Sequence, residues 1–434
     1  MRSAATHAND TPGLGERAIA RLLLPLAAGV IALLTLTPSG GESAAMTSLW
    51  CLRCGDFGAV DVVLNTLLFT PLGLALGLMG IPWRRTVLTA LLTSLGIEAL
   101  QLTIISGRDA SLSDLITNTT GGALGAALAL HWRRLVLPRP SDARALLAIM
   151  ALTWTATRLG TSWLLRPSFP DTVWYGQIAP RDVYPADFRG EVLHADIAGV
   201  AARTGRMPEL NTALRAPTVG VRALVSGAKT TPRLASVISV LDEQRAEVLV
   251  LGQEGNAARF RSRLRTADAR FRTPSIRLDG ALPPDAHAPT DLTGFRSPGR
   301  LSLSSATLGR VTDATITLGP GLGWALLLPF DAGLTPAIAE AGTAAFVAAA
   351  LLLVGYFAGM AFPGRPVAAA CVALALGALG LWCPSVVFPE ATVAVSEVLA
   401  AALATIPGIL AATGVSRLVR QGDQPPTRNG APVR

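Results

Sequence analysis

Eight long runs of apolar residues constrain the fold of this chain more than any other feature. A helix that crosses the hydrocarbon core of a bilayer needs roughly 20 apolar residues, and it pairs its backbone polar groups internally. The runs cover residues 18–37, 62–80, 86–105, 115–132, 145–165, 341–361, 366–382 and 391–415. We therefore predict a polytopic α-helical membrane protein with about eight transmembrane helices.

The composition agrees with a membrane protein. Half of the 434 residues are hydrophobic, only 15% are charged, and the mean hydropathy is +0.46, whereas about 25% of the residues in a soluble domain are charged. The net charge of +8 raises the question of nucleic acid binding. The basic residues, however, flank the apolar runs or lie in one polar middle segment, without interleaved aromatic residues. We expect a lipid bilayer as partner and no nucleic acid.

Arginines in the short connections predict the orientation, because cytoplasmic loops are enriched in Lys and Arg. With eight spans, all of these arginines fall on one side of the membrane. They are Arg17, Arg21, Arg84, Arg85, Arg133, Arg134, Arg139, Arg144, Arg365, Arg417 and Arg420. We expect a multi-pass protein of the cytoplasmic membrane with both termini cytoplasmic. The first run is then a retained anchor, and the polar segment 166–328 lies outside.

Two further charged residues lie inside the fifth and the eighth run. Arg158 is near the outer end of the fifth span, so we expect its long side chain to reach toward the lipid headgroups. Glu397 is the main charge of the last three spans, which we interpret as structural support.

Polar residues recur at one depth in spans two, three and four. Each span carries a pair three or four residues apart, and this spacing puts both members on one helix face. The pairs are Asp61 with Asn65, Glu98 with Gln101, and Asp114 with Asn118, and Arg108 lies in the loop between spans three and four. A carboxylate in hydrocarbon needs a partner, a proton or a water-filled pocket. We predict a polar outer pocket in which Arg108 is the counter-charge of Glu98.

Structural roles remain the alternative for each of these residues taken singly. Asp61 and Asp114 have the position of helix N-terminal residues that the helix dipole favours. The amide side chains could serve as interhelical hydrogen bonds, and Glu98 with Arg108 as an ion pair. The glycines of TTGGALG, residues 119–125, are spaced so that two helix backbones can approach closely.

The order of these residues resembles the VanZ-like membrane family. It reads D-x3-N-x5-PLG, then E-x2-Q, then R-x5-D-x3-N-x2-GG, and the resemblance covers roughly residues 18–135. The matching positions are Asp61, Asn65, Pro71, Leu72, Gly73, Glu98, Gln101, Arg108, Asp114, Asn118, Gly121 and Gly122. The resemblance implies a bacterial cytoplasmic-membrane protein, and the family's founding member is associated with resistance to the glycopeptide teicoplanin. It implies no reaction mechanism.

Cys51 and Cys54 form a C-x2-C pair in the first outer loop. Such a pair can be half of a zinc site, a redox motif or a disulfide. No second C-x2-C and no nearby histidine completes a metal site. The outer location favours a disulfide between the two, with free thiols as the alternative, and we expect neither a metal nor a cofactor.

In the polar middle of the chain the apolar residues recur with a different period. From about residue 171 to residue 330 apolar residues alternate with polar ones, as in TVGVRALVSG and RLASVISVLD, between Gly, Pro and Asp turns. This pattern predicts an antiparallel β-sandwich of about 150 residues. We read GWALLLPF, residues 323–330, as its last strand. We interpret the basic run RFRSRLRT, residues 259–266, as a solvated strand face, with contact to anionic lipid or wall polymer as the alternative.

The stretch ASVISVLDEQRAEVLVLGQEGNAARFRSRL resembles the central strands of a concanavalin A-like or laminin G-like domain. This resemblance implies a jelly-roll sandwich and, by analogy, carbohydrate binding, although a fold does not supply a ligand. A spacer or partner-docking role stays open. Trp174 and Tyr175 are candidates for sugar contacts, with a core role as the alternative. Hydrolysis of a glycan would need two carboxylates about 5–10 Å apart, and the available ones are Asp242, Glu243, Glu247 and Glu254.

These features divide the chain into six parts. They are a cytoplasmic tail (1–17), a VanZ-like four-helix transmembrane domain (18–135), a fifth transmembrane helix (136–165), an extracytoplasmic β-sandwich (166–330), three C-terminal transmembrane helices (331–415) and a disordered cytoplasmic tail (416–434).

We weigh three functions. The first is a cell-envelope protein that binds a cell-wall glycan or lipid-linked precursor at the outer face, with a role in glycopeptide tolerance. The second is a membrane-embedded enzyme acting on a lipid-linked substrate, with Glu98 as general base, Asp114 or Asp61 as its acid or metal partner and Arg108 as anion clamp. The third is a transporter, for which no inverted repeat is evident. We favour the first, because no His, Ser or Cys nucleophile accompanies Glu98.

Overall fold

The chain divides into two compact units, Met1–Pro138 and Arg139–Arg434. The computed structural model describes residues 13–37, 57–105, 111–283 and 288–422.

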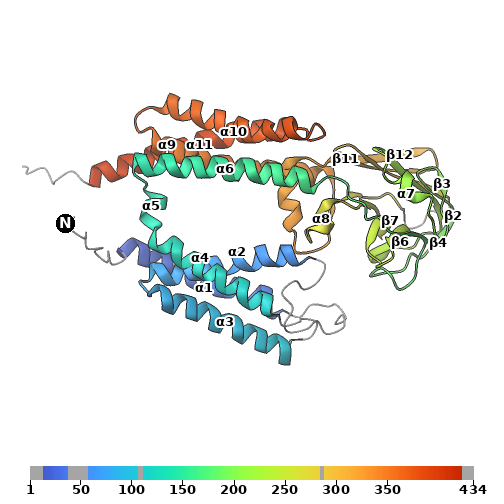
Figure 1. Cartoon of the computed structure of the whole chain (residues 1–434), viewed down its shortest axis with the longest axis horizontal. Coiled ribbons are helices and arrows are strands. Elements are labelled where there is room, and N and C mark those ends of the chain that lie inside the picture. Colours follow the sequence, from blue (N-terminus) through green and yellow to red (C-terminus); the bar gives the residue numbers. More distant parts are fainter. Residues whose placement is uncertain (1–12, 38–56, 106–110, 284–287, 423–434) are drawn as a thin grey trace, which may run out of the picture. The chain divides into compact units, whose positions relative to one another are not determined.

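Helices make up the first unit (Figure 1). They are α1 (Leu14–Leu36), α2 (Gly58–Leu78), α3 (Trp83–Thr103), α4 (Leu112–Leu130) and the short α5 (Trp132–Val136). The most extensive packing joins α2 to α4, while α3 packs on α4 and α1 on α2. The apolar core of the bundle includes Phe69 and Leu72 of α2, Ala90 and Ile97 of α3, and Ile31 of α1.

The close approach of α2 and α4 depends on glycines in both helices. A Cβ on Gly73 would lie 2.0 Å from the carbonyl oxygen of Gly122, and a Cβ on Gly125 would lie 2.0 Å from that of Thr70. Small residues at helix interfaces let backbones come together in this way. The expectation for the glycines of residues 119–125 is confirmed.

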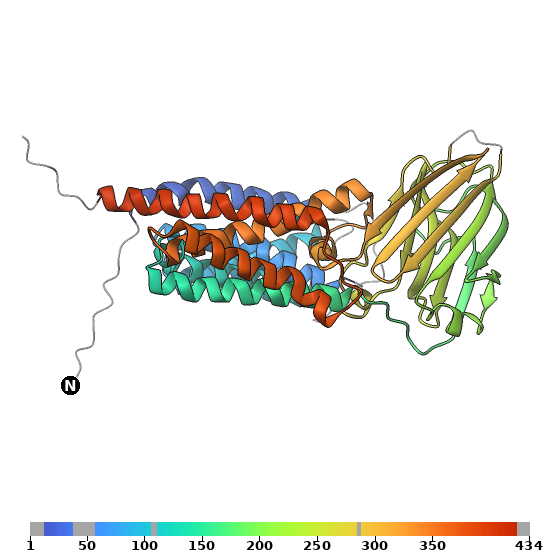
Figure 2. The ribbon, with the colours of Figure 1, turned by 90° about the horizontal axis from the view of Figure 1, so that it is seen from above.

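Four long helices and a β-sandwich form the second unit. The helices are α6 (Pro140–Leu164), α9 (Pro336–Ala361), α10 (Pro366–Val387) and α11 (Val395–Gly422). Figures 1 and 2 show them side by side, with the sandwich at one end. Their shared core is apolar and includes Trp154, Val347, Leu351, Ala358 and Ala404.

Within the described residues, six helices are long and apolar enough to cross a membrane: α1, α2, α3, α9, α10 and α11. The protein is therefore a helical membrane protein. The two other predicted spans also fall on long helices, α4 and α6, which are more polar. Much of this polarity is turned inward, because Asn118 of α4 and Arg158 of α6 are both buried.

Arg158 corrects one expectation from the sequence. Its side chain is fully buried and forms an ion pair with Glu397 of α11, so it does not reach out to the headgroups. The Arg158 guanidinium also lies 5.1 Å from the ring centre of Trp154, one turn away on α6. A buried charge needs such partners, and here the partner is 239 residues away in sequence.

Two sheets packed face to face form the sandwich (Figure 2). The strands are β1 (Trp174–Ile178), β2 (Glu191–Ile197), β3 (Val200–Ala201), β4 (Gly205–Arg206), β5 (Val219–Ser226), β6 (Thr231–Asp242), β7 (Glu247–Gly255), β8 (Ala257–Ser262), β9 (Ser275–Leu278), β10 (Thr290–Ser297), β11 (Arg300–Thr307), β12 (Arg310–Thr317) and β13 (Gly333–Leu334), with short helices α7 (Leu210–Ala213) and α8 (Arg265–Asp268). One sheet has the order β13-β9-β8-β7-β6-β1-β4 and the other β12-β11-β10-β5-β2-β3. The pairing is antiparallel, apart from the parallel contact of β13 with β9.

Alternating apolar residues fill the space between the sheets, as their period of two predicts. Val219, Val221 and Ala223 of β5 are buried, and Phe260 of β8 lies against the facing sheet. A Cβ on Gly294 of β10 would come within 2.6 Å of the Phe260 ring. The sandwich predicted from the alternation is present.

The segment GWALLLPF is not a strand, which corrects a second expectation. Residues Pro320–Leu327 form a 3-10 helix, η1. Pro320 has no N–H to give to a sheet ladder. Leu322, Ala325 and Leu326 of η1 instead join the sandwich core, while Gly323 adjoins Thr161 of α6 and Trp324 adjoins Gly342 of α9.

The basic run on β8 is largely paired, so its interpretation as a solvated face is wrong. Arg259 is buried and donates to Glu254 at 3.2 Å and to Asp331 at 2.8 Å. Arg261 binds Glu247 through two nitrogens, at 2.6 and 3.0 Å, and also Asp331 at 2.9 Å. Asp331 thus connects two arginines of β8 to the segment that precedes α9.

This network predicts a pH dependence. Burial by itself would raise the pKa of the Asp331 carboxyl, but the charges and hydrogen bonds of Arg261 and Arg259 outweigh it, so its pKa lies below the ordinary value. Because the pKa of the Asp331 carboxyl is lower in the folded than in the unfolded state, the ionised carboxylate stabilises the folded state above the unfolded pKa, about 3.9. This stabilisation is lost as the pH falls below that value toward the folded pKa. We expect Asp331→Asn to lower the midpoint of thermal unfolding by about 2–4 °C at pH 7.

The Asp331→Asn effect should shrink as the pH of the melt is lowered from 7 to 3. Asp313→Asn is the matched control, because Asp313 is an exposed carboxylate on β12. An equal effect of the two substitutions at pH 7 would contradict the stabilising role of Asp331.

Candidate functional site

The predicted polar residues meet where α4 begins. The N-cap of α4 is Ser111, whose hydroxyl accepts a 3.0 Å hydrogen bond from the backbone N–H of Asp114. The start of α2 and the last two turns of α3 lie against this turn, because α4 packs on both helices. We call Asn65, Glu98, Asp114 and Asn118, with Ser94 and Ser111, the polar cluster.

Glu98 is buried in the polar cluster, with 9% of its surface exposed. The backbone N–H of Ser111 donates to its Oε2 at 2.8 Å. Asp114 is close enough for the two carboxylates to interact electrostatically. Within the described residues the Glu98 Oε1 accepts no hydrogen bond, and the predicted counter-charge Arg108 lies outside those residues.

Two amide side chains tie the three helices together. Asn65 of α2 donates to the Asp114 Oδ1 of α4 at 2.7 Å. Asn118 of α4 donates to the hydroxyl of Ser94 on α3 at 2.9 Å. The Asn118 Oδ1 is buried and has no hydrogen-bond partner among the described residues. Buried polar atoms are normally paired, so this oxygen is a second acceptor that can take a hydrogen bond.

Gln101 has its described partner outside the polar cluster, and Asp61 is exposed at the start of α2. The Gln101 side chain is buried and donates to the backbone oxygen of Thr35 on α1 at 2.9 Å. This contact suits an interhelical structural role. Asp61 is exposed in the first turn of α2. The prediction that all six polar residues share one pocket remains a prediction for these two.

Three predicted residues lie outside the described part of the chain. They are Arg108, the proposed counter-charge of Glu98, and the two cysteines of the proposed disulfide, Cys51 and Cys54. The ion pair and the disulfide therefore stay predictions.

Sequence reasoning did not include the two serines of the polar cluster. Ser94 lies four residues before Glu98, on the same face of α3. Ser111 precedes the first apolar residue of α4, and Asp114 follows three residues later, which is an N-cap pattern. Both signals are present in the sequence.

The chemistry of the polar cluster is that of an acceptor site. Its two atoms without a partner among the described residues, Glu98 Oε1 and Asn118 Oδ1, are oxygens that accept hydrogen bonds. Hydroxyl, amide or ammonium groups of a ligand would suit them, whereas a phosphate would not. No group of three or more His, Cys, Asp or Glu residues that could hold a metal occurs in residues 13–37, 57–105, 111–283 and 288–422.

A second candidate site lies at the edge of the seven-stranded sheet. A cavity of about 300 Å³ is lined by β1, β4 and the β6–β7 turn. Tyr175 lines it with 36% of its surface exposed, beside Gln177, Asp242, Glu243 and Arg245. Trp174, in contrast, is buried in the sandwich core. An exposed aromatic ring beside polar side chains is a common setting for a polar ligand.

Three of the carboxylates considered for hydrolysis, Asp242, Glu247 and Glu254, have structural partners. Asp242 accepts hydrogen bonds from the backbone of Gln244 and Ala246. Glu247 and Glu254 bind the arginines of β8. These contacts weigh against a hydrolytic pair in this part of the sandwich.

The fold and the polar cluster define a class of protein: a multi-helical membrane protein that carries a β-sandwich and an inward-facing polar cluster. Residues 25–134 match the family model described as VanZ/LLP1, so the N-terminal helical region is VanZ-like. No curated protein and no solved structure matches the chain.

Proposed function

We propose that this protein is a cell-envelope protein that binds a cell-wall glycan or its lipid-linked precursor at the outer face of the cytoplasmic membrane. The VanZ-like match supports a cell-envelope membrane protein. The observation that carries the proposal is the polar cluster, in which the buried Glu98 and Asn118 each have one oxygen without a hydrogen-bond partner among the described residues. We extend the proposal to a role in tolerance of glycopeptide antibiotics, which act on the same precursors.

The proposed topology places both termini in the cytoplasm and the sandwich outside. In the second unit the sandwich adjoins the C-terminal end of α6 and the N-terminal end of α9. Arg139, Arg144, Arg365 and Arg417 lie at the opposite ends of the four helices. The excess of arginine in cytoplasmic loops favours this orientation.

The ligand chemistry follows from the two acceptors. A glycan or a glycopeptide precursor offers many hydroxyl and amide donors. A hydrogen bond to a charged acceptor contributes about 1.5–3 kcal/mol, so Glu98 would account for a tenfold or larger share of the affinity. The cavity beside Tyr175 is a separate candidate glycan site on the sandwich.

Antibiotic susceptibility tests the biological part of the proposal. A bacterial strain that lacks the protein would be complemented with wild type, Glu98→Gln or a deletion of residues 171–320. We expect tolerance of teicoplanin to fall without the protein and to stay low with Glu98→Gln, because the substitution removes the charge while keeping the shape. Vancomycin would be tested in parallel.

Glu340→Gln is the matched control for this experiment, since Glu340 is an exposed glutamate of α9. Each variant must reach the membrane at the wild-type level. Unchanged tolerance in every strain would remove the resistance role from the proposal.

A membrane-embedded enzyme is the second candidate function. The specific observation in its favour is the proximity of two carboxylates, Glu98 and Asp114, at one helix N-terminus. Such pairs can divide the roles of acid and base. Turnover of a lipid-linked substrate that disappears with Glu98→Gln, while binding persists, would favour it.

A further inference from the structure

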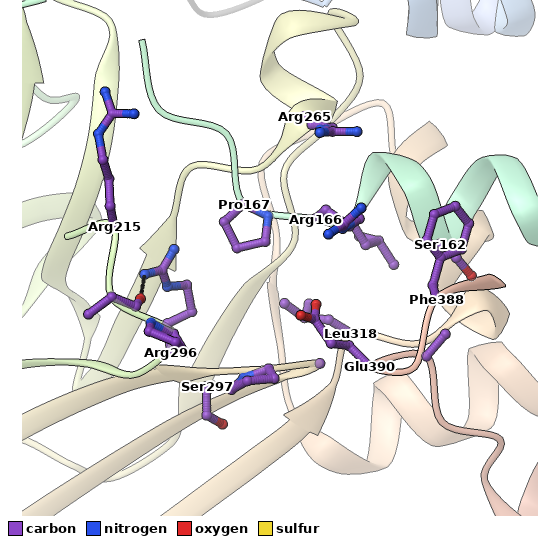
Figure 3. Close-up of a pocket in the computed structure, with 16 residues that line it drawn as sticks. Ser162, Arg166, Pro167, Arg215, Arg265, Arg296, Ser297, Leu318, Phe388 and Glu390 are labelled. Atoms are coloured by element: carbon purple, nitrogen blue, oxygen red, sulfur yellow. Dashed lines mark hydrogen bonds between the residues drawn. The ribbon is translucent and has the colours of Figure 1, made fainter. Parts of the chain in front are cut away.

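A cavity of about 260 Å³ lies within the second unit, between the sandwich and the membrane helices. Figure 3 shows side chains from separate segments around it: the chain after α6, the sandwich loops, and the connection from α10 to α11. The charged residues that line it are Arg166, Arg215, Arg265, Arg296 and Glu390. Four guanidinium groups against one carboxylate leave a formal charge of +3.

Arg296 is the buried cation of this cavity, with 2% of its surface exposed. Its Nη2 donates to the carbonyl oxygens of Leu214 and Ala216 at 2.7 and 2.9 Å. Its Nε and Nη1 have no partner among the described residues. Burial lowers the pKa of the Arg296 guanidinium to about 10, so the group is still protonated at neutral pH. A buried charge with two unused N–H groups calls for an anion.

Arg166 and Arg265 are held in place but not neutralised. The Arg265 guanidinium lies 4.9 Å from the ring centre of Trp163, and that of Arg166 lies 5.7 Å from Phe388. Stacking orients a guanidinium and leaves its charge available. Neither side chain has an ion pair or hydrogen bond with any residue in the described ranges. Arg215, in contrast, has an acidic partner in Asp171.

The cavity lies beside the ends of two long helices, α6 and α10. It is lined by residues that directly follow α6 and α10, which end at Leu164 and Val387. Trp163 and Trp382, near these two ends, are 47% and 48% exposed. Tryptophan is enriched at the depth of the lipid headgroups. An anion that enters the cavity from the membrane would therefore be part of a headgroup.

We propose that this cavity binds the phosphate group of an anionic membrane lipid through Arg166, Arg265 and Arg296. The planar fork of a guanidinium matches phosphate oxygens. The cavity is smaller than the roughly 300–1,000 Å³ of a typical small-molecule site, so it would hold the headgroup while the acyl chains stay in the bilayer. This inference does not depend on the polar cluster of the first unit.

Glu390 allows a test in which the proposal predicts stronger lipid binding rather than a loss. Its carboxylate lines the same cavity and makes no ion pair with the described arginines, so it opposes an incoming phosphate. Removing its charge with Glu390→Gln should strengthen lipid binding by a few fold. A purely structural role of the cavity would not produce a gain.

Native mass spectrometry of the full chain in neutral detergent measures the binding. Phosphatidylglycerol is the test lipid, diacylglycerol lacks the phosphate, and inorganic pyrophosphate is the soluble anion. We expect one tightly bound phosphatidylglycerol per chain and little binding of diacylglycerol. The double variant Arg166→Gln/Arg265→Gln should bind phosphatidylglycerol at least tenfold more weakly, because each charged hydrogen bond contributes about 1.5–3 kcal/mol.

Arg233→Gln/Arg310→Gln is the matched control, an equal loss of two charges from exposed arginines of β6 and β12, and it should bind like wild type. The stacked arginines have no other partners in the described residues, so the double variant should keep the wild-type melting temperature. Equal binding by wild type and the double variant would overturn the proposal. So would binding of pyrophosphate without binding of phosphatidylglycerol, since the site would then serve a free anion.

Discussion

Replacing Glu397 with glutamine should destabilise the membrane helices of the second unit by about 3–5 kcal/mol. Glu397 and Arg158 form an ion pair whose side chains are 3% and 0% exposed. The substitution leaves the Arg158 charge buried without a counter-charge, and two of its nitrogens already lack partners among the described residues. Unfolding of the purified chain by SDS would measure the loss.

The double variant Arg158→Met/Glu397→Met separates the cost of an unpaired charge from the value of the pair. Replacing both members of a buried pair with apolar residues is often nearly neutral, so we expect it to be more stable than Glu397→Gln. Glu16→Gln is the control at the exposed pair with Arg133, where about 0–1 kcal/mol is expected. A Glu397→Gln protein as stable as wild type would contradict the buried pairing.

Gly125→Ala should be the second most damaging substitution, although it adds only one methyl group. The new Cβ would lie 2.0 Å from the carbonyl oxygen of Thr70 and 2.5 Å from the backbone nitrogen of Leu74. Backbone atoms of a helix cannot move aside as a flexible side chain can, so α2 and α4 must separate. We expect a loss of about 3 kcal/mol, at the upper end for overpacking, in the same SDS assay.

Gly96→Ala is the matched control on the neighbouring helix α3. Nothing lies within 4 Å of a Cβ placed on Gly96. Alanine has a higher helix propensity than glycine, by about 1 kcal/mol, so this variant should be as stable as wild type or more stable. If both alanine variants behave alike, the close packing of α2 and α4 does not depend on Gly125.

Local sequence patterns predicted the elements of this protein well. Runs of about 20 apolar residues marked every long helix, including α4 and α6, whose polar residues turn inward. Alternation marked β5, β6, β7 and β8 of the sandwich. The exception is η1, where Pro320 and three glycines, at positions 319, 321 and 323, favour a 3-10 turn over a strand. An apolar run predicts that a segment is buried, and η1 is buried. The run does not by itself distinguish a strand from a helix.

Pairings over long sequence distances could not be predicted in the same way. Arg158 lies near a helix end, so the sequence favoured a solvated position. Its partner Glu397 is 239 residues away, and only the fold brings the two side chains together. Arg259 looked like one member of a basic run, and its acidic partner Asp331 is 72 residues away. The arginines of the 260 Å³ cavity come from two loops, from α8 and from β10, and their convergence depends on the whole second unit.

The polar cluster is the intermediate case. Spacing put Asn65, Glu98, Asp114 and Asn118 on helix faces that could meet, and hydrogen bonds now connect Asn65 to Asp114 and the start of α4 to Glu98. The acceptor atoms that lack a partner among the described residues could not be predicted, because they depend on which oxygen each neighbour uses.

Binding of a lipid-linked cell-wall precursor to the purified full chain tests the central claim most directly. The chain would be held in nanodiscs and titrated with the precursor, with wild type, Glu98→Gln and the control Glu340→Gln side by side. We predict saturable binding that Glu98→Gln weakens about tenfold or more and Glu340→Gln leaves unchanged. Equal affinity of Glu98→Gln and wild type, or no binding by either, would contradict the account.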